Sequence, residues 1–195
     1  MQIGLYFGSF NPIHIGHLII ANHIATNTIL NEVWFVVSPQ NPLKYTKSLL
    51  NEQHRLALVK VAIEGDPNLK ASNVEFSLPK PSYTADTLMY LSEKYPQHSF
   101  TLILGSDSYT NISKWKNYQF ILNNYPLFIY LRPGFALTNT PDNCTIIDAP
   151  LLQISATDIR QKIKNKKSIK YLVTDAVLAA IQKEGYYSSQ LENPT

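Results

Sequence analysis

The sequence has little cysteine and lacks a long hydrophobic run. Cys144 is the one cysteine among 195 residues, so an internal disulfide is impossible and we expect a reducing, cytoplasmic setting. The apolar runs are far too short to span a bilayer. Met1 leads into a strand-like pattern instead of a basic segment followed by an apolar one, so we expect no signal peptide and no membrane association.

Charge of either sign is also sparse. Charged residues make up 16% of the chain, fewer than the roughly 25% of an average domain, and the 45% of hydrophobic residues is that of a globular protein; the net charge is +3. That charge suits an enzyme of anionic nucleotides and gives no reason to expect a nucleic-acid partner. The oligomeric state stays open, with a homo-oligomer among the alternatives. The densest basic segment is typical of a solvated, charged helix end. It comprises Arg160, Lys162, Lys164, Lys166, Lys167 and Lys170.

Apolar strand-like runs alternate with helical patterns along most of the chain. This alternation predicts a single α/β domain over residues 1–187 with a Rossmann-like, doubly wound parallel sheet and helices on both faces. We expect the polar tail, residues 188–195, to be disordered. The expected strands are Ile3–Phe7, Val33–Val37, a weaker Leu69–Phe76, Phe100–Leu104, Leu127–Leu131 and Thr145–Ile147. The expected helical segments are His14–Thr28, Asn51–Ile63 with Gly65 as C-cap, Thr84–Tyr95, short pieces in Ile112–Asn124, Ser155–Lys164 and Thr174–Glu184 stopped by Gly185.

A glycine turn with two histidines lies at the first strand-to-helix junction. A helix N-terminus in this position offers free N–H groups to phosphate. His14 and His17 are three residues apart, which places both imidazoles on one face of the first helical turn, and Gly16 allows a ligand to approach the backbone. A GxGxxG dinucleotide fingerprint is absent here, which speaks against a dehydrogenase. The junction reads Gly8-Ser9-Phe10-Asn11-Pro12-Ile13-His14-Ile15-Gly16-His17.

This stretch resembles the GxFxPxHxGH signature of the HxGH nucleotidyltransferase superfamily, whose histidines bind the phosphates of a nucleoside triphosphate. The segment Ile154 to Arg160 resembles the superfamily's second signature, ISSTxIR, except that Ala156 stands where serine is usual. By residue type, Ser155 or Thr157 caps a helix, and Arg160 can clamp a β- or γ-phosphate in bidentate fashion.

Three further segments resemble bacterial nicotinate-nucleotide adenylyltransferases. The loop Ser38 to Lys44 resembles their SPxxPHK stretch, with Leu43 in place of histidine; Lys44 could reach an anionic substrate or equally be a solvated loop residue. Ser82 to Leu88 matches their SYTxDTL stretch, with Thr84 as the expected N-cap. The third segment has Gly105 and Asp107 at a strand end, where a carboxylate can meet a ribose hydroxyl, followed by Trp115, which the resemblance assigns to stacking on the nicotinate ring.

The resemblance implies adenylyl transfer from ATP to nicotinate mononucleotide, which gives deamido-NAD and pyrophosphate. The nucleophile is a phosphate that is already anionic near neutral pH, so the reaction needs alignment and charge compensation more than a general base. We expect His14, His17, Lys44 and Arg160 to be catalytic. ATP would further contact Gly8, Ser9, Phe10, Gly16, Gly105, Asp107, Ile154, Ser155 and Thr157, and the mononucleotide Asn11, Lys44, Ser82, Tyr83, Thr84 and Trp115.

The sequence provides no dedicated metal-ligand cluster, so we expect Mg²⁺ to be bound through the ATP phosphates. Two alternatives remain open. One is an HxGH adenylyltransferase acting on nicotinamide mononucleotide or phosphopantetheine, and the other is a nucleotide-binding module without turnover.

Overall fold

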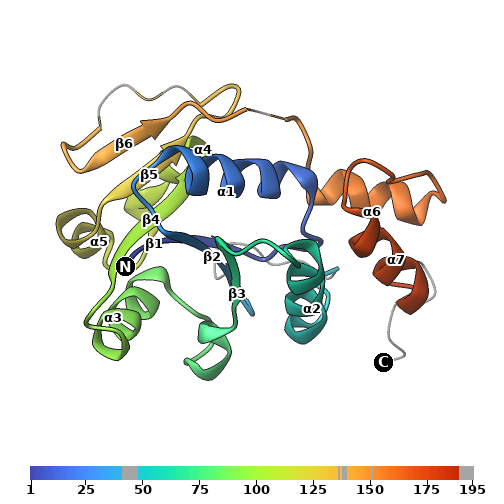
Figure 1. Ribbon diagram of the computed structural model, residues 1–195, viewed down its shortest axis with the longest axis horizontal. Helices are drawn as coiled ribbons and strands as arrows, with labels where there is room; N and C mark the ends of the chain where they lie inside the picture. Colours follow the sequence, from blue (N-terminus) through green and yellow to red (C-terminus); the bar gives the residue numbers. More distant parts are fainter. Residues whose placement is uncertain (41–47, 136, 138–139, 151, 189–195) are drawn as a thin grey trace.

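The computed structural model describes residues 1–40, 48–135, 137, 140–150 and 152–188. In these residues six strands form one parallel sheet in the order β3-β2-β1-β4-β5-β6 (Figure 1). The strands are β1 Gln2–Gly8, β2 Glu32–Val37, β3 Leu69–Ser72, β4 Ser99–Gly105, β5 Leu127–Tyr130 and β6 Cys144–Ile147. The helices are α1 Ile15–Asn27, α2 Glu52–Ala62, α3 Thr84–Lys94, α4 Ser106–Tyr109, α5 Tyr118–Asn124, α6 Ala156–Lys164 and α7 Asp175–Glu184, with 3₁₀ turns η1 Val74–Ser77 and η2 Ile112–Lys114.

Both faces of the sheet are covered by helices. Alternate residues of the central strands point to opposite faces, and the apolar side chains on each face pack against a layer of helices. On β1, Tyr6 belongs to the core shared with α1, α2, α6 and α7, whereas its neighbour Leu5 belongs to the core shared with α3 and α5. Figure 1 shows α1 and α3 on opposite sides of the sheet. The predicted doubly wound α/β fold is therefore confirmed.

The strand order changes direction next to β1. From β1 the chain moves outward through β2 and β3, and it then crosses back to β4 on the other side of β1. A crevice outside the carboxyl ends of the strands is expected at such a switch point, and ligands bind there in open α/β sheets. The α1 N-terminus, α4 and the loop after β5 all lie at this edge, as does the α6–α7 pair, which packs beside the start of α1 (Figure 1).

Most element boundaries agree with the sequence prediction, but three differ. The weaker strand predicted for Leu69–Phe76 ends at Ser72, because Asn73 adopts a turn conformation and η1 follows; Asn is unfavourable in strands and favourable in turns. Gly65 is not the C-cap of α2: the cap is Ile63, and Gly65 lies two residues further on with φ +84°. Thr84 is the first residue of α3, and the N-cap is Tyr83.

Three elements add to the prediction or confirm its details. The short helix α4 directly follows β4, in a stretch for which the sequence analysis predicted no helix. Ser155 is the N-cap of α6, since its side chain accepts a hydrogen bond from the Asp158 amide at 3.1 Å. Gly185 ends α7 with φ +66°, as expected of a glycine C-cap.

Candidate functional site

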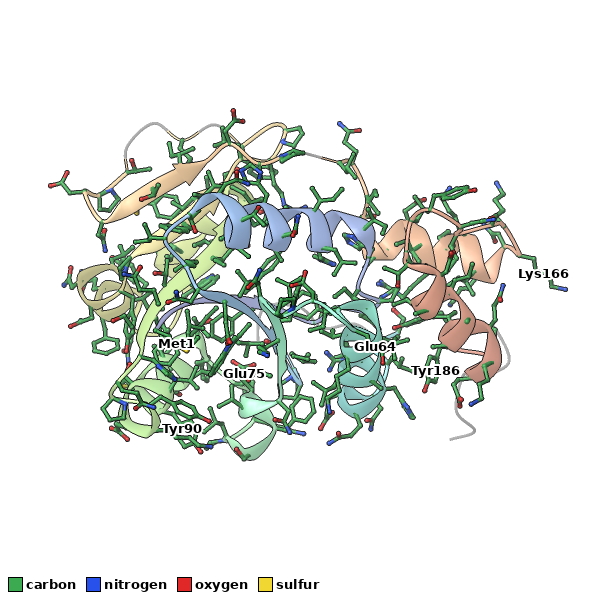
Figure 2. All side chains as sticks on the ribbon, viewed as in Figure 1. Met1, Glu64, Glu75, Tyr90, Lys166 and Tyr186 are labelled. Carbon is green, nitrogen blue, oxygen red and sulfur yellow. The ribbon has the colours of Figure 1, made fainter. Side chains whose placement is uncertain are left out.

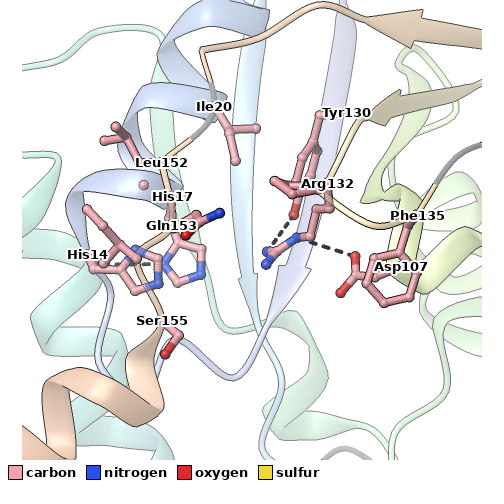
Figure 3. A pocket seen from close by; sticks show the side chains of 13 residues that line it. His14, His17, Ile20, Asp107, Tyr130, Arg132, Phe135, Leu152, Gln153 and Ser155 are labelled. Atoms are coloured by element: carbon pink, nitrogen blue, oxygen red, sulfur yellow. Dashed lines mark hydrogen bonds and ion pairs between the residues drawn. The ribbon is translucent and has the colours of Figure 1, made fainter.

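A cavity of about 360 Å³ lies at the switch point. In Figure 3 the two histidines and Ser155 stand on one side of it, and Asp107, Tyr130 and Arg132 stand on the other. Six of the residues predicted for ATP are among those that line it: His14, Gly16, His17, Asp107, Ile154 and Ser155. Its other lining residues are Ile20, Tyr130, Arg132, Pro133, Phe135, Leu152 and Gln153.

The histidine pair is built into the first turn of α1. His14 is the N-cap residue, and its backbone N–H donates to Nδ1 of His17 at 3.3 Å. The two imidazole rings stack with centroids 3.6 Å apart and an angle of 20° between their planes. Gly16 makes room for this arrangement, because a Cβ there would lie 3.1 Å from Nδ1 of His14, which is closer than ordinary packing allows.

The His14 imidazole is neutral near pH 7. Burial, helped by the nearby Arg132 guanidinium, lowers the pKa of His14 from 6.5 to about 4. A neutral imidazole next to an arginine can donate a hydrogen bond to an incoming anion without adding to the positive charge of the empty cavity.

The wall opposite the histidines is a chain of polar contacts. The Arg132 Nε lies 3.3 Å from Asp107 Oδ1, and its Nη2 donates to the Tyr130 hydroxyl, also at 3.3 Å. The Tyr130 hydroxyl in turn lies 3.1 Å from that of Tyr6. Gly105 allows this packing, because a Cβ there would overlap the Asp107 carboxylate and approach Arg132 Nε to 3.1 Å.

Arg132 and Tyr130 were not predicted as site residues. A signal for Arg132 existed in the sequence, since Arg132-Pro133-Gly134 directly follows a predicted strand and therefore lies at the carboxyl edge. Tyr130 is a strand residue in an apolar run, and nothing in the local pattern distinguishes it from a core residue.

The second signature joins the first through Arg160. Its Nη1 donates to the Asn11 carbonyl oxygen at 2.7 Å, and its Nη2 donates to the Thr157 hydroxyl at 3.3 Å. The Asn11 side chain is itself engaged, since it donates to the Ser48 carbonyl at 2.9 Å and accepts from the Leu50 amide at 3.2 Å. Burial lowers the pKa of Arg160, which still carries its charge at neutral pH.

The residues between β1 and α1 support the histidine pair through their own contacts. Gly8 ends β1, and its carbonyl accepts from the Ser38 amide at 2.9 Å. Phe10 is buried with φ +44°, and its ring meets the His17 ring edge-on at 5.1 Å. The Ser9 carbonyl accepts from the fully buried Arg55, a residue that the sequence analysis did not single out.

The predicted mononucleotide residues of α3 form a separate group, and none of them lines the 360 Å³ cavity. Tyr83 supplies no side-chain hydrogen bond to the α3 N-terminus. Trp115 follows η2 and packs, partly buried, against the core that includes α3. Its neighbour Lys116 forms an ion pair with Asp86 at 2.8 Å and lies 4.8 Å from the Tyr83 ring centroid, so the Trp115 segment adjoins the start of α3.

Lys44 and Leu43 lie outside the described residues, as do residues 189–195 of the predicted tail. Ser188, the first residue of that tail, is hydrogen-bonded to the Gly185 carbonyl through its hydroxyl at 2.6 Å. Over the described parts of the chain, no three His, Cys, Asp or Glu side chains gather closely enough to hold a metal ion. Within the same ranges, every helix is too short or too polar to cross a membrane.

Comparisons with known proteins all give nucleotidyltransferases. The cytidylyltransferase-like family model matches residues 5–162. The chain is 53% identical to the probable nicotinate-nucleotide adenylyltransferase of Cytophaga hutchinsonii, over 97% of this chain and 100% of that protein. It is 49% identical to the corresponding Flavobacterium psychrophilum protein, over 96% and 99% of the two chains.

A solved structure has the same fold. Plasmodium falciparum nicotinic acid mononucleotide adenylyltransferase complexed with NaAD superposes with a TM-score of 0.83 at 22% identity, over 95% of this chain and 97% of the other.

Proposed function

We propose that the cavity between His14 and Arg132 is where ATP binds and reacts. The chain belongs to the nicotinate-nucleotide adenylyltransferases of the cytidylyltransferase-like family and has their activity. The enzyme transfers the adenylyl group of ATP to nicotinate mononucleotide in NAD biosynthesis. The observation that best supports this placement is the stacked His14–His17 pair at the start of α1, facing an arginine across the cavity.

The cavity has the chemistry that ATP requires. Positive and hydrogen-bonding groups for phosphates come from the histidines, from Arg132 and from the N-terminus of α6 at Ser155. Apolar surface for the adenine ring comes from Ile20, Phe135 and Leu152. Asp107 can accept a hydrogen bond from a ribose hydroxyl at the end of β4.

Arg160 supports the proposed triphosphate site from its edge. Its guanidinium is oriented by Asn11 and Thr157, at the junction of the two signature segments. In this position Arg160 can contact the leaving pyrophosphate, while the Asn11 carbonyl holds the side chain in place. Lys44, outside the described residues, is proposed as a further cation for the phosphates.

The proposed mononucleotide site is the start of α3 with Trp115. The N-cap residue Tyr83 supplies no side-chain hydrogen bond to α3, so the first N–H groups of the helix and its positive dipole end can bond the nicotinate carboxylate. The Trp115 ring, partly exposed and adjoining this turn, offers a face for the pyridine ring.

In the proposed mechanism the enzyme aligns two substrates and compensates their charge. A phosphate oxygen of the mononucleotide forms a bond to the α-phosphorus of ATP while the bond from that phosphorus to pyrophosphate breaks. The nucleophile is already deprotonated, so no side chain has to remove a proton. His14 and His17 donate hydrogen bonds that strengthen as negative charge develops on the phosphoryl oxygens.

Mg²⁺ fits this site only as a partner of the substrate. Asp107, the one carboxylate that lines the described cavity, is already paired with Arg132. We therefore propose that the ion is held by ATP phosphates and water, where it would neutralise phosphate charge.

A substrate panel tests the proposed function. Pyrophosphate release is measured from ATP with nicotinate mononucleotide, with phosphopantetheine and with no acceptor. Release that depends on the mononucleotide is expected. Equal release with phosphopantetheine, or none with either acceptor, would contradict the proposal.

A further inference from the structure

Glu75 is a buried carboxyl group that the proposed mechanism does not use. It lies in η1, where Figure 2 labels it. It is 1% exposed and does not line the cavity. Its Oε2 accepts from the Ser82 hydroxyl at 2.8 Å, and its Oε1 accepts from the Thr87 hydroxyl at the same distance. Each carboxylate oxygen thus has its own hydroxyl donor.

Placing a carboxylate here is energetically costly. Burial raises the pKa of Glu75, and hydrogen bonds from Ser82, Thr87 and Ser38 only partly offset that rise. An apolar residue of similar size would avoid this penalty. What the carboxyl group contributes instead is a fixed position for the hydroxyls that bond to it.

Its two hydroxyl partners lie on either side of the proposed nicotinate site. Ser82 immediately precedes Tyr83 and Thr84, and Thr87 follows them in the first turn of α3. The Thr87 hydroxyl shares its one proton between Glu75 and the Tyr83 carbonyl, which lies 3.2 Å away, so it contacts both Glu75 and the backbone of the N-cap residue. The carboxyl group therefore bonds one hydroxyl just before α3 and one in its first turn, and neither bond uses a backbone N–H group of the helix.

The same carboxyl group reaches the loop after β2. Ser38 lies near two buried ionisable groups, since its side chain helps to lower the pKa of Glu75 and its carbonyl accepts from Arg55 at 2.8 Å. Arg55 also holds the Pro39 carbonyl at 3.0 Å. Through Ser38, Glu75 connects the start of α3 to the loop that leads towards Lys44.

We propose that Glu75 is a positioning residue for nicotinate mononucleotide. Glu75 sets the first turn of α3 against the Ser38 loop, so that the backbone N–H groups at Thr84 face the nicotinate carboxylate. This inference rests on the proposed placement of the mononucleotide at α3 and Trp115. A direct electrostatic role would have the opposite sign, because removing a negative charge near the acid would tighten its binding.

The test is a comparison of KM values for the two substrates in Glu75→Gln. This change keeps the size of the side chain but turns one acceptor into a donor, so Ser82 or Thr87 loses its partner. We expect KM for nicotinate mononucleotide to rise about tenfold, the scale of one unpaired buried group, with KM for ATP nearly unchanged. An unchanged or lowered KM for the mononucleotide, or an equal rise for both substrates, would overturn the proposal.

Thr87 provides a second test that leaves the carboxyl group in place. Thr87→Val removes the hydroxyl at nearly constant volume, and we expect the same selective rise in KM. Thr87→Ser keeps the hydroxyl and should restore native values. The matched control is Thr101→Val, the same change at a buried position in β4, where both KM values should stay native. If Glu75→Gln does not fold, the Thr87 pair decides by the same criterion.

Trp115→Ala separates this inference from the proposed function. If Trp115→Ala raises KM for the mononucleotide and Glu75→Gln does not, the nicotinate site stands and the positioning role is wrong. If Trp115→Ala leaves that KM unchanged, the proposed nicotinate site is wrong and the inference falls with it.

Discussion

Arg160 donates a hydrogen bond to the Asn11 carbonyl oxygen at 2.7 Å across 149 positions of sequence. This bond joins the segment that contains the histidines to the segment that begins α6. Each segment predicts a phosphate site by itself, and the contact shows that they form one surface. The orientation of the guanidinium therefore depends on both segments being folded.

Arg160→Lys tests the geometry of this contact. Lysine keeps the charge, but a single ammonium group cannot reproduce the planar fork that bonds Asn11 and Thr157 together. We expect KM for ATP to rise about tenfold, the scale of one lost charge-assisted hydrogen bond, with a smaller effect on KM for the mononucleotide. Initial rates with each substrate varied in turn provide the measurement.

The control for Arg160→Lys is Lys167→Ala, which removes an exposed charge from the same basic segment. It should leave both KM values native. An equal effect of Arg160→Lys on the two substrates would speak against an ATP-specific role.

His14 should make stability depend on pH in a definite direction. Its pKa is lowered from 6.5 in the unfolded chain to about 4 in the folded protein, so the unfolded chain binds the proton more tightly. The contribution of His14 to the free energy of unfolding is therefore complete above pH 6.5. It decreases as the pH falls from 6.5 towards 4, by about 3 kcal/mol in total.

The measurement is the free energy of unfolding against pH for the native chain and for His14→Asn. The asparagine does not titrate, so the difference between the two curves isolates His14 from other groups. The native chain should lose more stability than the variant between pH 7 and 4. Parallel curves would show that the pKa of His14 is not lowered.

Preference for the acid over the amide follows from the start of α3. N–H groups there can bond the nicotinate carboxylate, whereas a carboxamide brings its own N–H₂ group towards other donors. An unpaired buried donor costs on the order of 1–3 kcal/mol, which corresponds to at least about tenfold in kcat/KM. We expect that preference for nicotinate over nicotinamide mononucleotide in a pyrophosphate assay; equal values would contradict the α3 site.

The features of the protein that are predictable from its sequence have short-range causes. Apolar periodicity is enough to predict β1, α1 and the doubly wound sheet. The spacing of His14, Gly16 and His17 predicts a shared helical face, and Ser155 before Arg160 predicts a capped helix; the structure has both.

The parts that were not predictable depend on partners distant in sequence. Glu75 lies within the weak strand predicted for Leu69–Phe76, and its burial depends on the hydroxyls of Ser82 and Thr87. The sequence places Arg132 at the carboxyl edge of the sheet, but its pairing with Asp107 becomes visible only once α4 lies beside β5.

If the stacked histidines stabilise charge during adenylyl transfer, the turnover number of His17→Ala must fall. Pyrophosphate release would be measured with both substrates saturating, with His23→Ala as the control, since His23 is a histidine of the same helix outside the cavity. We predict that His17→Ala lowers kcat by about 10²–10³-fold, the range for loss of one preorganised donor, while the control keeps native turnover. Near-native kcat in both His17→Ala and His14→Ala would contradict the account.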